Sequence, residues 1–137
     1  MLRRWLSRLL RRGVCVKTAR AEFHTQRESL QEAFFEQAAR SGLPRGLRWK
    51  NCEWGERVEF LRERASGQLL ALVEVVIHFE AIPDSDMDGW PAVELPRAAS
   101  AVFVHVGGVW QTTGKTLFNL PPDEALERLA GQYDRGE

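Results

Sequence analysis

The fold is decided by two runs of β-type sequence and the turn between them, in residues 58–82, VEFLRERASGQLLALVEVVIHFEAI. Apolar and polar residues alternate along both runs, which is the period of a half-buried strand. Small and polar residues separate the runs at positions 65–68, and a two-residue turn at Ser66-Gly67 places Phe60 opposite Val73. One face of this predicted hairpin carries an apolar stripe: Val58, Phe60, Val73, Val75, Ile77 and Phe79.

A second hairpin is predicted further along the chain. Residues 101–106 and 109–113 alternate in the same way and flank Gly107-Gly108. Glycine supplies the positive φ that a tight hairpin turn requires. This turn places His105 directly opposite Trp110.

A long helix is predicted before the strands. Apolar residues recur at three- and four-residue spacing over residues 26–41, and capping boxes begin at Thr25 and at Ser29. Gly42 and Pro44 follow where a helix would end.

These elements, together with shorter strands at residues 47–50 and 115–120, predict an α+β fold. N-terminal helices precede an antiparallel meander of four to six strands wrapped on the long helix, and a short C-terminal helix begins at Pro121. We expect residues 21–137 to form one domain and residues 1–20 to form an arm. The layout resembles the cystatin-like and NTF2-like folds, which host carriers, inhibitors and enzymes alike.

The composition also indicates a single folded domain. The chain has 137 residues, of which 44% are hydrophobic and 28% are charged, and this excludes a disordered chain. Two cysteines, Cys15 and Cys52, cannot supply a four-ligand zinc site alone. No apolar run is long enough to cross a membrane.

The neutral total charge hides a basic arm on an acidic body. Residues 1–20 hold seven basic and no acidic side chains, whereas the remainder holds twelve basic and nineteen acidic ones. Apolar residues recur at helical spacing in the arm (Leu2, Trp5, Leu6, Leu9 and Leu10), and Gly13 is expected to end this helix. Such a helix is typical of an anionic membrane surface, with these candidate contacts: Arg3, Arg4, Trp5, Arg8, Arg11 and Arg12.

Other uses of the arm remain open. It would serve as a mitochondrial presequence in a eukaryote, as a terminal helix docked on the body, or as a nucleic-acid arm. We expect a cytoplasmic protein that lies at the membrane periphery if the arm binds lipid.

The sheet is predicted to be apolar on both faces. The helix at residues 26–41 can cover one face, so the other needs a terminal helix, a partner subunit or a ligand. Its predicted residues are Leu61, Leu70, Leu72, Val76, Phe103 and Trp110. This excess of apolar surface on the second face favours a protein partner or a homodimer.

A catalytic or metal site is not predicted, and no cofactor is expected. Should the hairpins align, His78, His105 and Glu74 would line one surface, with Glu59 facing Glu74. The alternative is an ordinary solvated sheet face.

The opening of a calcium loop occurs at residues 84–89, with the candidate ligands Asp84, Asp86 and Asp88. The remaining ligand positions fail, which indicates a solvated acidic turn.

Six short strings over residues 45–130 resemble a family of small bacterial domains of unknown function. The strings are Gly46-Leu47-Arg48-Trp49, Phe79-Glu80-Ala81-Ile82, Asp86-Met87, Ala101-Val102-Phe103, Gly108-Val109-Trp110 and Phe118-Asn119-Leu120 with Pro122. The resemblance implies no activity and no role for any residue.

The leading prediction is therefore a non-enzymatic interaction domain, held near a membrane by its arm. The first alternative is an NTF2-like pocket protein that binds a small ligand or acts as an enzyme through His78, His105 and Glu74. The second is a nucleic-acid accessory protein that uses only the arm.

Overall fold

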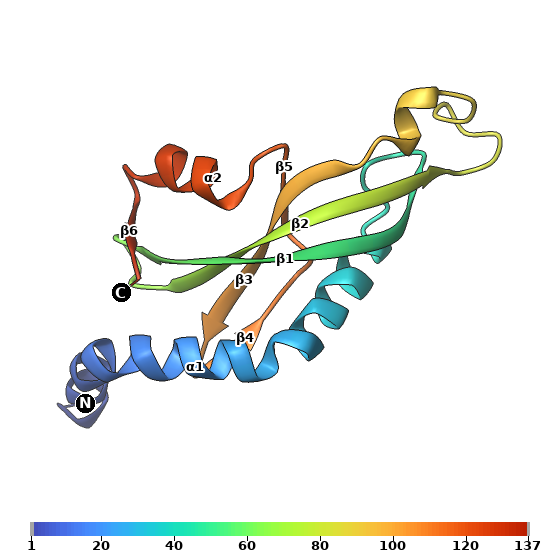
Figure 1. Cartoon of the computed structure of the whole chain (residues 1–137). Coiled ribbons are helices and arrows are strands. Elements are labelled where there is room, and N and C mark those ends of the chain that lie inside the picture. Colours follow the sequence, from blue (N-terminus) through green and yellow to red (C-terminus); the bar gives the residue numbers. More distant parts are fainter. Residues whose placement is uncertain (1, 137) are drawn as a thin grey trace.

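A computed structural model describes the backbone of residues 2–136 and the side chains of residues 16–136. Within this part of the chain, one antiparallel sheet lies between two helices (Figure 1). The helices are α1 (Leu2–Arg40) and α2 (Pro122–Leu129). The strands are β1 (Leu47–Glu63), β2 (Leu69–Ala81), β3 (Arg97–Val106), β4 (Val109–Gln111), β5 (Thr116–Phe118) and β6 (Tyr133–Arg135). The predicted α+β class and antiparallel sheet are confirmed.

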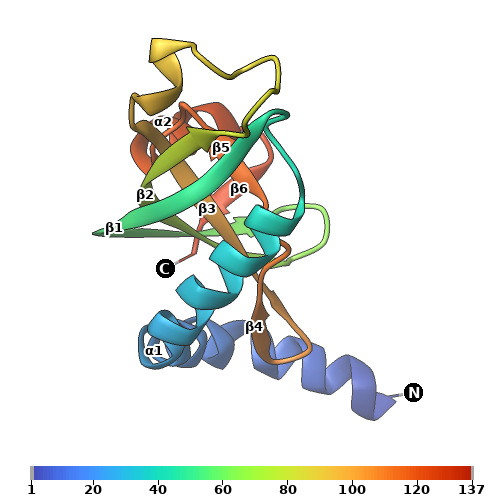
Figure 2. The same ribbon diagram turned by 90° about the vertical axis from the view of Figure 1, so that its right-hand side faces the viewer.

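Strands β1 to β4 form a meander, and β6 returns to pair with the other edge of β1. The strand order of the sheet is β4-β3-β2-β1-β6, and β5 pairs with β3 beyond the end of β4. A short 3-10 helix, Pro91–Glu94, lies in the connector between β2 and β3. The α1 helix crosses one face of the sheet and α2 lies on the other, which Figure 2 shows from the side.

The prediction of separate N-terminal helices is wrong, because α1 is a single helix of 39 residues that runs through Gly13. Thr25 and Ser29 do not cap it. Their hydroxyls donate to the carbonyls of Ala21 and Gln26, within the helix interior. The end of the helix follows the prediction, with Gly42 at a φ of 70°.

The predicted strands at residues 47–50 and 58–64 are parts of one strand, β1. The apolar period breaks between them because β1 shifts register between Trp49 and Asn51 and again between Trp54 and Val58. The first shift moves the core-facing positions from Leu47 and Trp49 to Cys52 and Trp54.

The first hairpin forms with a different register from the predicted one. Phe60 pairs with Ala71 rather than Val73, and the Glu63 N–H donates to the Gln68 carbonyl across a longer turn. Because the difference is two residues, every side chain keeps its predicted face. The second hairpin is confirmed, with His105 opposite Trp110.

Aromatic rings fill the core between α1 and the sheet. Phe23 lies in edge-to-face contact with Trp110 at 5.1 Å and with Phe103 at 5.4 Å between ring centroids. The Trp110 Nε1–H donates to the Ala19 carbonyl at 2.7 Å. This hydrogen bond joins the end of the sheet to the middle of α1.

Candidate functional site

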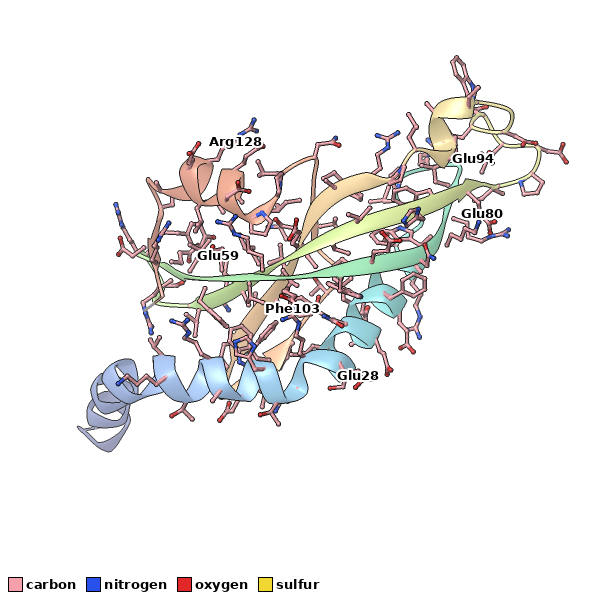
Figure 3. All side chains as sticks on the ribbon, in the orientation of Figure 1. Glu28, Glu59, Glu80, Glu94, Phe103 and Arg128 are labelled. Atoms are coloured by element: carbon pink, nitrogen blue, oxygen red, sulfur yellow. The ribbon has the colours of Figure 1, made fainter. Side chains whose placement is uncertain are left out.

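The six residues predicted to share one binding face lie on both faces of the sheet. Phe103 and Trp110 point toward α1 and are buried there; Figure 3 labels Phe103 between the sheet and the helix. Phe103 pairs with Ala71, so it shares the face of the valine stripe. The prediction placed it on the opposite face because the pairing of the two hairpins could not be read from either hairpin alone.

The opposite face of the sheet is covered by the chain itself. Leu61, Leu70 and Leu72 are buried beside the fully buried Ala125 of α2. The packing is completed by half-buried side chains: Val104, Leu117, Leu120, Leu126, Leu129 and Tyr133. Of the six predicted residues only Val76 stays half-exposed. Of the three covers expected for this face, a terminal helix, a partner subunit or a ligand, the described chain supplies the first, with help from β5 and β6.

His78, His105 and Glu74 do not form one group. His105 pairs with Leu69, which is about 30 Å along β2 from His78 at the usual rise per residue. The two histidines also point to opposite faces. Glu59 lies opposite Leu72 instead of Glu74, so the predicted pair of facing carboxylates is also wrong.

Each histidine instead faces one carboxylate. The His105 Nε2 lies 3.8 Å from a carboxylate oxygen of Glu22 on α1, and the ring contacts Trp110. The His78 Nε2 lies 3.5 Å from Glu53 on β1. Neither arrangement includes a nucleophile or a second base, so the described residues give no support for catalysis at these positions.

The three aspartates of the connector do not converge. The Asp88 carboxylate accepts a hydrogen bond from the Asp84 N–H at 3.0 Å, and Asp84 has a φ of 63°. In residues 16–136 no group of three His, Cys, Asp or Glu side chains could hold a metal ion.

The predicted arm is the first part of α1. The side chains of the candidate contacts Arg3, Arg4, Trp5, Arg8, Arg11 and Arg12 lie outside the described residues. The backbone of this part is helical and extends past the edge of the sheet (Figure 1). Among the helices that the structure describes, none combines the length and apolarity needed to cross a bilayer.

A groove of about 500 Å³ lies between α1 and β1, and it was not predicted from the sequence. It is lined by α1 (Glu28, Gln31, Glu32, Phe35 and Glu36) and by β1 (Lys50, Asn51, Cys52 and Trp54). The acidic residues at four-residue spacing were a visible signal on the predicted helix. The strand residues of the groove could not be predicted, because the register shift in β1 changes which of its residues face α1.

The thiol of Cys52 lines this groove. Its partial burial raises its pKa to about 12, since the thiolate would lose hydration there. The thiol is therefore protonated at neutral pH and is not an activated nucleophile.

The connector between β2 and β3 forms an acidic pole at the other end of the molecule. Trp90 and Leu95 are 62% and 60% exposed there. Glu80 and Glu94 line two hollows beside them, and Figure 3 shows both glutamates at the end of the sheet remote from the start of α1.

Comparisons with known proteins give no relative from which a function could be transferred. No family model, no curated protein and no solved structure matches the chain. The resemblance to small bacterial domains drawn from six short strings gains no support from them.

Proposed function

We propose that this protein is a non-enzymatic interaction domain that docks on anionic membrane surfaces through the first part of α1. The observation that carries the proposal is the continuity of α1. A basic segment without acidic residues is the helical extension of an element that is anchored in the core.

The apolar spacing supports this function. Leu2 and Leu9 continue the seven-residue spacing of Val16, Phe23 and Leu30, the last three of which are buried against the sheet. This row of apolar positions therefore continues, in the sequence, from the core into the segment beyond the sheet. A helix with Trp and Leu on one side and Arg on the other is suited to the interface of a bilayer.

The charge pattern favours lipid over self-association of the arm. Two arms laid side by side would bring up to fourteen positive charges together with no acid between them. An anionic bilayer attracts each Lys or Arg by about 1 kcal/mol near its surface.

The pocket-protein alternative has less support. His105 lies on the opposite face of the sheet from His78 and Glu74, and aromatic side chains occupy the space between α1 and the sheet. No specific observation favours nucleic acid over lipid.

Co-sedimentation with vesicles tests the proposal. The full chain should bind vesicles containing phosphatidylglycerol and leave neutral phosphatidylcholine vesicles unbound. A chain that begins at residue 15 keeps Val16 and the core, and it should lose about a hundredfold or more in partitioning.

Substitutions separate charge from folding. Changing Arg3, Arg4, Arg8 and Arg11 to Gln should abolish binding, whereas changing them to Lys should preserve most of it. Equal partitioning of the full and shortened chains would contradict the proposal. Stronger binding to DNA than to anionic vesicles would favour the nucleic-acid alternative.

A further inference from the structure

The outer edge of β1 is open along its first half. Within residues 2–136, that edge pairs only with β6, at Leu61–Glu63. The Leu47 N–H donates to the Pro44 carbonyl, and the Arg27 guanidinium donates to the carbonyls of Gly55 and Glu56. Residues 48–54 lie between these two sets of hydrogen bonds. An unpaired strand edge presents backbone donors and acceptors to another chain.

The groove between α1 and β1 lies directly beside this open edge. Its strand wall is formed by four of residues 50–54 (all but Glu53), and its helix wall by side chains between Glu28 and Glu36. Phe35 and Trp54 are half-buried in it, and Trp54 is held edge-on against Phe34 at 5.3 Å. An added strand would therefore meet both backbone hydrogen-bonding groups and aromatic surface.

The helix wall is acidic. Glu28, Glu32 and Glu36 are exposed, and none of them forms an ion pair within the described side chains. They recur every four residues, about 6 Å along a helix, while alternate residues of an extended peptide recur about every 6.6 Å. Lys50 is the one basic residue lining the groove, which keeps it net negative.

We propose that this groove binds an extended basic peptide of a partner protein, which adds as a strand to residues 48–54 of β1. The peptide backbone pairs with the open edge. Its alternate Lys or Arg side chains face the three glutamates, and a guanidinium can also lie over Trp54. The binding is independent of the proposed membrane function, which uses the opposite end of α1.

A second copy of this chain is a poorer occupant through the same edge. Pairing two β1 edges would bring two acidic helix walls toward each other. The basic arm of a second copy has the right charge, but it is helical and would not present a strand edge.

Fluorescence anisotropy with the full chain tests the inference. The probe is a fluorescein-labelled peptide that alternates arginine and threonine, compared with the same peptide methylated at alternate backbone nitrogens. Methylation keeps the charge and removes the backbone donors, so it should weaken binding about tenfold or more. Equal binding of the two peptides would overturn strand addition.

The protein side has a matched control. Replacing Glu28, Glu32 and Glu36 by Gln should weaken binding about tenfold, since three exposed ion pairs are lost. Replacing Asp123 by Asn and Glu124 and Glu127 by Gln removes the same charge from α2, on the other face of the sheet, and should leave binding unchanged. Equal losses of peptide affinity in the two triple variants would show that the peptide is attracted to the acidic domain in general. That result would overturn the proposed groove site.

The oligomeric state is measured on the same samples. A mass above that of a monomer, which falls to the monomer in the Glu28, Glu32 and Glu36 variant, would make a second copy the occupant. That result would overturn the proposal of a separate peptide partner.

Discussion

Gly114 lies where the segment after β4 meets the end of α1. Its φ is 84°, and an added Cβ would lie 2.5 Å from the backbone nitrogen of Ala38. We expect Gly114→Ala to lower the free energy of unfolding by about 3 kcal/mol, through left-handed strain and overpacking together.

Gly108 gives the matched control for this substitution. It has the same φ of 84°, but an added Cβ meets nothing within 4 Å. Gly108→Ala should cost only about 1 kcal/mol, the conformational part. Urea denaturation measures both, and equal losses would rule out the close contact with α1.

Cys52 should make stability depend on alkaline pH. Burial raises the pKa of its thiol from 9.0 to about 12, so the unfolded chain releases this proton first. The stabilising contribution is fully present below pH 9 and falls as the pH rises toward 12. In a Cys15→Ser background, the midpoint of urea unfolding should fall more steeply with pH than in the same chain carrying Cys52→Ser. Parallel pH profiles would show that the Cys52 thiol is as hydrated as in the unfolded chain.

At the scale of elements, α2 is small but packs on the apolar cluster of the face opposite α1. Ala125 is fully buried in the cluster that contains Leu61 and Leu72. We expect Ala125→Asp to cost about 3 kcal/mol or more, because a carboxylate would be buried without a partner.

The neighbouring exposed residue Glu124 provides the comparison. Glu124→Ala on the same helix should change stability by about 0.5 kcal/mol or less. Thermal unfolding followed by circular dichroism measures both variants. Similar unfolding temperatures would mean that α2 does not seal this face.

The α1 helix shows how far local sequence rules reach. Thr25 and Ser29 have the spacing of capping boxes, yet they lie within the helix. Residues before and after them in the sequence belong to one row of buried apolar side chains. Capping signals were overridden by packing, since burying Val16, Ala19 and Phe23 requires the helix to begin earlier.

The whole molecule is electrically asymmetric along its length. The basic start of α1 lies at one end, and the acidic connector with Trp90 lies at the other (Figure 1). An anionic surface would attract the first end and repel the second, so the domain should dock in one orientation.

This orientation can be measured with an environment-sensitive dye. In a background carrying Cys15→Ser and Cys52→Ser, a dye on Ser7→Cys should shift its emission to the blue on anionic vesicles. A dye on Asp86→Cys should not shift, and both effects should weaken as salt is raised because the attraction is screened. Equal shifts at the two positions would exclude a single docking orientation.

The candidate groove shows which part of a site could be foreseen. Glu28, Glu32 and Glu36 are readable as one acidic stripe on a predicted helix. Trp54 and Cys52 could not be assigned to the same groove, because the register shift after Trp49 depends on how β1 pairs with β2.

The sequence by itself determined the α+β class, the two hairpins and the stripe from Val58 to Phe79, because alternation and turn glycines act over a few neighbouring residues. Only the tertiary structure decided that Phe103 and Trp110 share the α1 face and that α2 covers Leu61, Leu70 and Leu72. These arrangements depend on the pairing of β2 with β3, which is set by the packing of the whole core and not by either strand alone.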